Sequence, residues 1–251
     1  MKPFRHGHDH GARPAMSIAK RGPISAYGRA LFPGPSAEGE SGRRRRLRIA
    51  YLCDRDPNDP NLYSGGNRRI RDALQAHAGE VTVLPQDWGA LDWLRRGVEA
   101  LPDALSIRLR WRLHFALAPL IARRVNRELE RRPPDIVFGA YALHALAGIR
   151  PPPGTLTVFT SDATPTTYRQ SEIGESFGSF LSASRLLDPA LTRAEARALA
   201  RADLLLWPTS WLDRAARAAY ALPEGGTRVI PWGANVPRPA TAAEPGAIGP
   251  D

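Results

Sequence analysis

Short apolar runs alternate with longer segments of helical periodicity from about residue 47 onward. The apolar runs predict six strands, which are Arg48–Asp54, Glu80–Leu84, Asp135–Ala140, Thr155–Thr160, Asp203–Trp207 and Arg228–Pro231. Between the first two strands, a helix is expected from about Asn67, and the residues on its inner face are Ile70, Ala73, Leu74 and His77. This alternation predicts an α/β fold in which helices flank a parallel sheet.

Further helices are indicated by local signals. Residues 103–132 predict a longer helical region that breaks near Pro119, because proline lacks the amide hydrogen that a helix interior needs. A hydroxyl residue followed three positions later by a carboxylate is typical of a helix start. Thr192-Arg-Ala-Glu195 and Ser210-Trp-Leu-Asp213 both have this pattern, so we expect helices to begin there.

Composition indicates one domain with tails. The chain has 251 residues, of which 43% are hydrophobic, and this is enough for one sizeable core. Residues 1–46 contain ten basic and three acidic side chains and show no periodicity, which predicts a disordered basic tail. We expect the folded domain to span residues 47–236 and a second disordered tail to span residues 237–251.

The uneven distribution of charge argues against nucleic acid as a partner. The formal net charge is +10, but residues 1–46 carry +7 of it and the remainder of the chain carries only +3. The part expected to fold is thus nearly neutral and has no known nucleic-acid-reading motif. The basic tail leaves peripheral contact with an anionic membrane open. Its histidines, which are His6, His8 and His10, make a poor metal site because a flexible tail fixes no ligand geometry, so we expect no metal and no cofactor.

The expected compartment is the cytoplasm. The single cysteine, Cys53, lies in an apolar run, where a buried structural thiol is favoured over a nucleophile. No apolar stretch approaches the roughly 20 residues of a transmembrane helix. The N-terminus also lacks the apolar core of a secretory signal peptide.

Candidate ligand-binding residues follow two of the predicted strands. After the first strand, Tyr63-Ser-Gly-Gly-Asn67 leads into a helix, where glycines let a backbone approach an anion and the helix dipole favours negative charge. Taken alone, the glycine pair fits a tight turn as well as a phosphate site. After the fourth strand, Asp162 is either a helix cap or a carboxylate in a cleft. Ligands of doubly wound sheets bind at the carboxyl ends of the strands, so we expect the main cleft there.

The second half of the chain resembles a known family. Strand, helix, strand, helix and strand follow one another in Thr157–Thr164, Glu195–Asp203, Leu204–Trp211 and Val229–Asn235. This order is similar to the N-terminal, acceptor-side domain of family-four GT-B glycosyltransferases, and the resemblance extends from about Arg48 to Asn235. It implies a Rossmann-like fold and hexosyl transfer from a nucleotide sugar to an acceptor.

The resemblance also implies roles for individual residues. Gly65 and Gly66 would offer amides to the diphosphate of the donor, with Ser64 and Asn67 close by. Asn235 would face the same cleft from the end of the domain.

On the acceptor side, the resemblance implies that Asp162 orients an acceptor hydroxyl or acts as a base. Both roles stay open because other members of the class carry histidine at this position. Ser161 lies beside it in the same loop. Tyr168 and Arg169 would hold a sugar ring or an anionic acceptor, unless they form only an exposed helix face.

Donor-binding groups of the family belong to a second domain and include an Arg, a Lys and two glutamates spaced eight apart. No two glutamates in the 251 residues have that spacing. We therefore expect a truncated acceptor-binding half of a retaining transferase that is inactive alone and partners a donor-domain polypeptide. The alternative is a non-catalytic binding module, or a degenerate remnant, that docks on such a partner.

Overall fold

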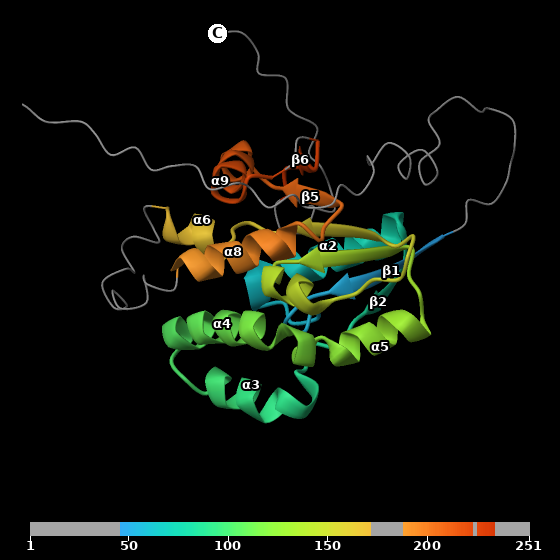
Figure 1. Cartoon of the computed structure of the whole chain (residues 1–251). Helices are drawn as coiled ribbons and strands as arrows, with labels where there is room; N and C mark the ends of the chain where they lie inside the picture. The colour runs from blue at the N-terminus through green and yellow to red at the C-terminus, as the bar shows by residue number, and fades with distance from the viewer. Residues whose placement is uncertain (1–45, 172–187, 223–224, 234–251) are drawn as a thin grey trace, which may run out of the picture. The chain divides into compact units, whose positions relative to one another are not determined.

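One parallel sheet organises the part of the chain described by the computed structural model, which comprises residues 46–171, 188–222 and 225–233. Its six strands are ordered β2-β1-β3-β4-β5-β6 (Figure 1). The strands are β1 (Leu47–Leu52), β2 (Gly79–Val83), β3 (Ile136–Ala140), β4 (Leu156–Thr160), β5 (Leu204–Trp207) and β6 (Thr227–Val229). Each expected strand is present with bounds within two residues of the prediction. The predicted tails, apart from Arg46, lie outside the described residues.

Helices connect the strands. They are η1 (Leu62–Gly65), α2 (Gly66–His77), η2 (Gly89–Leu91), α3 (Asp92–Glu99), α4 (Asp103–Ile121), α5 (Arg123–Arg131), η3 (Leu143–Gly148), α6 (Pro165–Arg169), α8 (Asp188–Leu199) and α9 (Ser210–Tyr220). The break expected near Pro119 occurs at Ala122, between α4 and α5. None of the helices in the described ranges combines the length and apolar character needed to cross a bilayer.

One predicted helix start is wrong and the other is correct, although its cap is shifted. α8 begins at Asp188 rather than Thr192, because tertiary partners engage the two residues of the expected cap. Thr192 Oγ1 lies 2.9 Å from Thr166 Oγ1, and buried Glu195 accepts a hydrogen bond from Thr166 N at 3.1 Å. α9 begins at Ser210 as predicted, but its N-cap is the preceding Thr209, whose Oγ1 accepts from Leu212 N at 3.1 Å.

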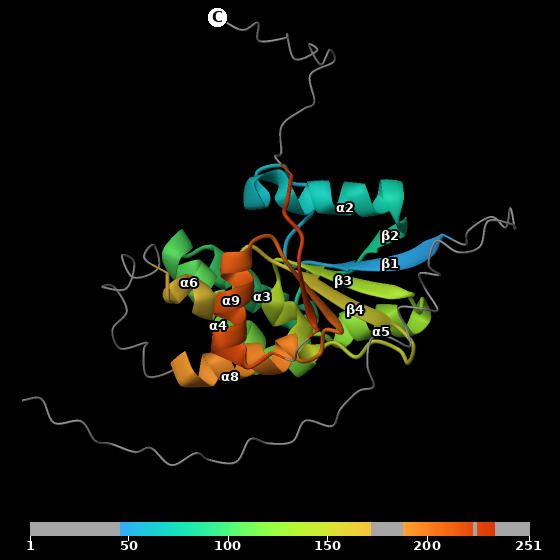
Figure 2. The same cartoon turned by 90° about the horizontal axis from the view of Figure 1, so that it is seen from above.

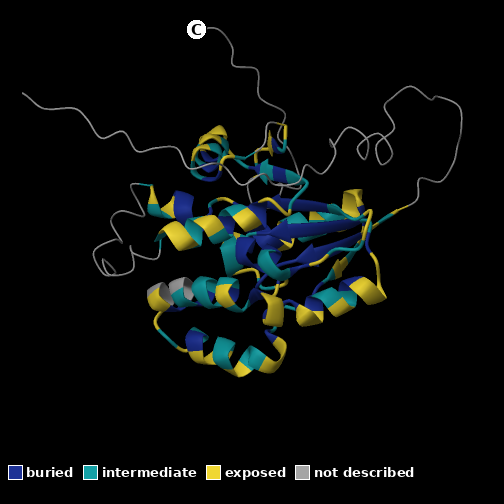
Figure 3. Cartoon of the chain, viewed as in Figure 1, coloured by how far each residue is buried: buried dark blue, intermediate teal, exposed yellow. Residues whose placement is uncertain are grey.

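The sheet separates two apolar clusters, and most strand residues are buried (Figure 3). On one face, α2 packs through Ile70 and Leu74 against alternate residues of β1 and β3. The opposite face is covered by α5, η3, α8 and α9 (Figure 2). Helices on both faces explain why the central strands read as continuous apolar runs. The fold is the expected Rossmann-like α/β arrangement.

Strand order creates a switch point between β1 and β3. β1 pairs with β2 on one side and with β3 on the other, so the chain leaves β1 in one direction and later returns on the opposite side. The loops that follow β1 and β3 therefore leave the carboxyl edge in opposite directions. This is the place in the fold where a ligand site is expected.

Candidate functional site

The loop after β1 ends in a left-handed turn. Tyr63, Ser64 and Gly65 have φ angles of 52°, 51° and 75°. Glycine adopts this conformation freely, whereas each of the other two residues is strained by roughly 1–2 kcal/mol. Such strain persists only where the surroundings impose it, and it is concentrated at functional sites.

The turn delivers the chain to an uncapped helix N-terminus. Gly65 is the N-cap of α2 and has no side chain with which to cap the helix, and the first turn holds no acid. Arg68 and Arg69 instead stand in that turn, and Arg68 Nε lies 3.7 Å from Asp72 Oδ2. Two basic side chains at the positive end of a helix dipole favour a bound anion.

Two predicted donor-site residues are engaged within the protein. The Gly66 amide donates to the Tyr63 carbonyl, so this amide is not offered outward. Asn67 is buried, and both its carbonyl oxygen, at 3.0 Å, and its Oδ1 accept from the Tyr51 hydroxyl. Asn67 thus anchors α2 to β1 instead of facing a ligand. Ser64 and Gly65 lie in the turn itself, and Asn235 lies outside the described residues.

A buried charged cluster lies directly behind the turn. Tyr63 donates its hydroxyl to Asp54 Oδ1 at 2.9 Å, and the other carboxylate oxygen, Oδ2, lies 2.9 Å from Arg110 Nη2 and 3.4 Å from His144 Nε2. Burial alone would raise the pKa of Asp54, but His144, Arg110 and the Tyr63 hydroxyl outweigh it and hold that pKa below its usual value. Asp54 is therefore a permanent anion at the end of β1.

His114, on α4, extends this buried cluster. Its ring lies 4.6 Å from that of His144 and 5.5 Å from that of Trp88, edge-on in both cases. Burial, together with the neighbouring His144 and Arg110, lowers the pKa of His114 well below 6.5. The ring is consequently neutral at physiological pH.

Aromatic side chains link the turn to the neighbouring loops. Tyr63 stacks on Tyr141, which directly follows β3, with ring centroids 4.2 Å apart and planes 14° apart. Trp232, which follows β6, meets Tyr141 edge-on at 5.2 Å. Tyr141 itself has a φ of 61°. These rings fill the switch point and connect three loops of the carboxyl edge.

Asp162 follows β4, and its charge acts on Tyr141. The residue as a whole is exposed although neighbouring groups partly bury its carboxylate, and the N-cap of α6 is Thr164, which forms a capping box with Thr167, so Asp162 is not the helix cap. Burial among neighbouring groups raises the pKa of Asp162, although its own backbone amide, that of Ala163 and the Ser161 hydroxyl oppose the shift. Ser161 is buried and donates to the Ala163 carbonyl at 2.6 Å, which fixes the loop.

The residues of α6 differ in their availability. Tyr168 is 38% exposed at the surface. Arg169 is held by its neighbours, since its guanidinium donates to Thr166 Oγ1 at 2.8 Å and pairs with Asp188 at 3.1 Å. Of the two, only Tyr168 presents a side chain that is ready to meet a ligand.

A groove of about 740 Å³ lies at the carboxyl ends of β1 and β2. Its lining includes Asp54, Asp56, Asp59, Arg95 and Arg124. Ser64, Gly65, Gly66 and Asp162 do not line it, so the groove lies at the expected edge of the sheet but not between the residues that were expected to line the main cleft. Most of its charges are paired, as in Arg95–Glu99 at 2.8 Å and Arg124–Asp87 at 2.6 Å.

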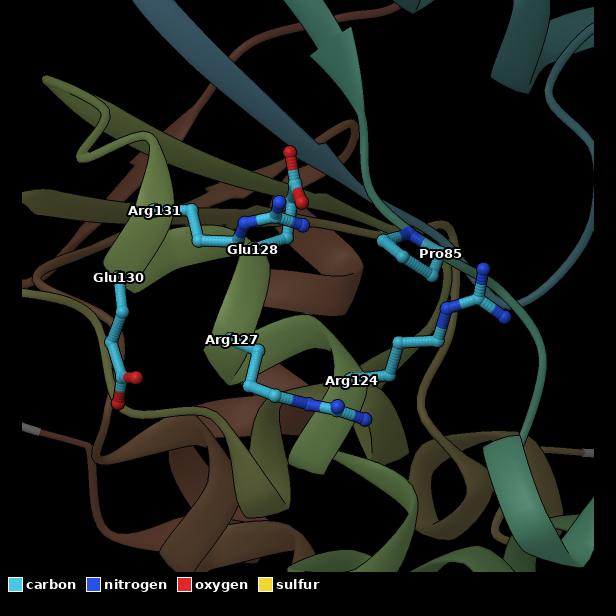
Figure 4. Close-up of a pocket in the computed structure, with 6 residues that line it drawn as sticks. All are labelled: Pro85, Arg124, Arg127, Glu128, Glu130 and Arg131. Atoms are coloured by element: carbon cyan, nitrogen blue, oxygen red, sulfur yellow. The ribbon is translucent and has the colours of Figure 1, made fainter.

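A second groove, of about 460 Å³, runs beside α5. Its arginines are spread along the groove and do not converge on one point (Figure 4). Among the described residues, no group of three or more His, Cys, Asp or Glu side chains is placed to hold a metal ion.

The sequence analysis missed the cluster around Asp54. Position offers a signal for Asp54 and Tyr141, because each directly follows a strand that ends at the carboxyl edge. No comparable signal marks Arg110, His114 or His144, which lie on α4 and η3 far along the chain. Cys53 is buried as expected, and burial together with the charge of Asp54 raises its pKa to about 12, so it is no nucleophile.

Comparison with known proteins agrees with this architecture. The family model described as Glycosyltransferase Family 4 matches residues 66–238, a span that starts at α2 and contains Asp162, Tyr168 and Arg169. No curated protein matches the chain. Because the family model covers well over half of the 251 residues, the chain belongs to glycosyltransferase family 4.

Proposed function

We propose that this domain binds a nucleotide-sugar donor and an acceptor at its carboxyl edge and takes part in hexosyl transfer. The uncapped, arginine-bearing N-terminus of α2 at the switch point carries this proposal. The dipole of α2 and its two arginines favour a diphosphate, which has negative charge at both phosphoryl groups. The Gly65 amide at the N-cap of α2 approaches the donor, and Ser64 flanks it.

Asp162 is proposed to orient the acceptor hydroxyl for attack on the anomeric carbon. A partly buried carboxylate with a raised pKa is a better proton acceptor than an ordinary aspartate and still accepts a hydrogen bond when ionised. Holding the hydroxyl in line with the donor supplies the proximity contribution to catalysis. Tyr168, one turn away on α6, offers a face for a sugar ring.

The 251 residues are proposed to be inactive without a donor-binding domain supplied by other residues. Charge on the departing nucleotide needs preorganised cations, and this electrostatic contribution is usually the largest in catalysis. The glutamate pair of the family's donor domain is not found among these residues. Adding a family-four donor domain in trans is expected to produce transfer.

The alternative is a non-catalytic module that docks on such a domain. It is favoured by the end of β6, where Val229 and Ile230 are 43% and 50% exposed. Trans-complementation separates the two functions, since a docking module binds the added domain without transferring sugar.

Amide chemical shifts of the full chain, titrated with uridine diphosphate, test the proposed donor site. We expect the largest shifts at residues 64–69 and weak affinity, because one wall of a cleft buries little ligand. Arg68→Gln and Arg69→Gln should each weaken binding several-fold, whereas Arg131→Gln, a matched arginine at the far end of α5, should not. Shifts confined to the amino edge of the sheet would refute the site.

A further inference from the structure

We propose that Asp54 is a positioning residue that acts through Tyr63 to hold the left-handed turn at the start of α2. The inference rests on the proposed function, because the turn presents the helix N-terminus to a diphosphate. Asp54 would touch neither donor nor acceptor.

Asp54 is fixed from several directions. Its side chain is 4% exposed, and its partners Arg110 and His144 are 6% and 3% exposed. They come from α4 and η3, whereas Asp54 lies two residues beyond the end of β1. The ion pair with Arg110 restricts the carboxylate, and Oδ1 accepts from the Tyr63 hydroxyl at 2.9 Å.

Tyr63 connects the Asp54 carboxylate to the backbone of the turn. Burial and the charge of Asp54 raise the pKa of Tyr63, which keeps its hydroxyl protonated as a donor. The ring is clamped against Tyr141, and the carbonyl of the same residue accepts from the Gly66 amide. One tyrosine thus joins the buried carboxylate to the first turn of α2.

The strain of the turn needs such an anchor. Tyr63 and Ser64 are both left-handed without being glycine, a conformation that a free loop would leave. A buried ion pair is in general no more stabilising than apolar side chains of the same size. The arrangement of Asp54, Arg110 and Tyr63 is therefore better explained by the geometry it imposes than by stability.

Tyr63→Phe tests the link, because it keeps the stacked ring and removes only the hydroxyl. Tyr63→Phe should bind uridine diphosphate about 3- to 10-fold more weakly than the wild type. Tyr63→Leu also loses the stacking, so its affinity should be lower still. Trp93→Phe, at a 70% exposed position on α3, is the aromatic control and should bind as the wild type does. Unchanged affinity in Tyr63→Phe would overturn the inference.

Amide hydrogen exchange provides a readout that does not depend on the ligand. Tyr63→Phe should speed exchange at residues 64–68 and leave β4 and β5 protected, whereas a merely structural role would lower protection across the sheet. If the wild type binds no uridine diphosphate, the proposed function fails. Exchange then still decides the positioning role, and unchanged rates at residues 64–68 would refute it.

Discussion

Replacing Arg110 with leucine removes the buried guanidinium that faces Asp54 and leaves the carboxylate without its ion-pair partner. Both side chains are nearly inaccessible, with 6% and 4% exposure, and the gap between Nη2 and Oδ2 is 2.9 Å. Breaking a buried pair from one side typically costs about 3–5 kcal/mol. For a domain of this size, that loss lowers Tm by about 10 °C. The loss of Arg110 affects Glu99 less than Asp54, because Glu99 keeps its ion pair with Arg95 at 2.8 Å.

The loss should depend on pH in a defined direction. In the wild type the pKa of Asp54 is depressed, so its contribution to stability is present above about 3.8 and disappears as pH falls through the folded value. Without Arg110, one of the groups that oppose burial is lost, so the pKa of Asp54 rises above its wild-type value. The carboxyl then becomes neutral at a higher pH, and the difference between variant and wild type should narrow from pH 7.5 to pH 4.5.

Urea unfolding followed by far-UV circular dichroism at both pH values measures the effect. The matched control is the double variant Asp54→Asn with Arg110→Leu, which leaves no buried charge and should recover a large part of the loss. A cost of the single variant below about 1 kcal/mol at pH 7.5 would show that the pair is solvated and would refute the reasoning.

Three further changes probe other parts of the domain. His114→Phe should flatten the dependence of stability on pH. The lowered pKa of His114 makes its contribution to stability present above pH 6.5 and lost below it, by up to about 1.4 kcal/mol per pH unit. Urea midpoints that change in parallel for the variant and the wild type from pH 7.5 to 5 would contradict this. Gly148→Ala should destabilise the domain by about 1–3 kcal/mol in thermal melts, since the added Cβ would lie 2.3 Å from the Ala118 carbonyl oxygen. The control Gly97→Ala, on α3, meets nothing within 4 Å and should be neutral or slightly stabilising. With a donor domain added in trans, Asp162→Asn should lower product formation by about 100-fold, and transfer at the wild-type rate would exclude Asp162 from catalysis.

Elements with strong local patterns were predictable from the sequence. The central strands are nearly continuous apolar runs because they are buried on both faces, and α2 shows its inner face directly in Ile70 and Leu74. The glycine-bearing loop after β1 was also visible, because residue type and strand position locate it at the carboxyl edge. The family was recognised from the same patterns in the second half of the chain.

Contacts between residues from distant segments could be determined only from the tertiary structure. The cap predicted at Thr192 failed because α6 lies against α8 and engages Thr192 and Glu195, a contact that no local pattern reveals. Asn67 was expected close to the donor, but its Oδ1 accepts a hydrogen bond from the Tyr51 hydroxyl, which also comes from another segment.

The candidate site shows the same division most clearly. Gly65 and Asp162 could be predicted as candidates from the sequence alone, since each needs only its own strand and loop to be placed. Asp54 could not be predicted in this way, because its partners Arg110 and His144 belong to α4 and η3 and contact it only in the folded protein. Buried charges are compensated by whichever groups the fold brings within about 3–4 Å, and that proximity is a property of packing rather than of sequence order.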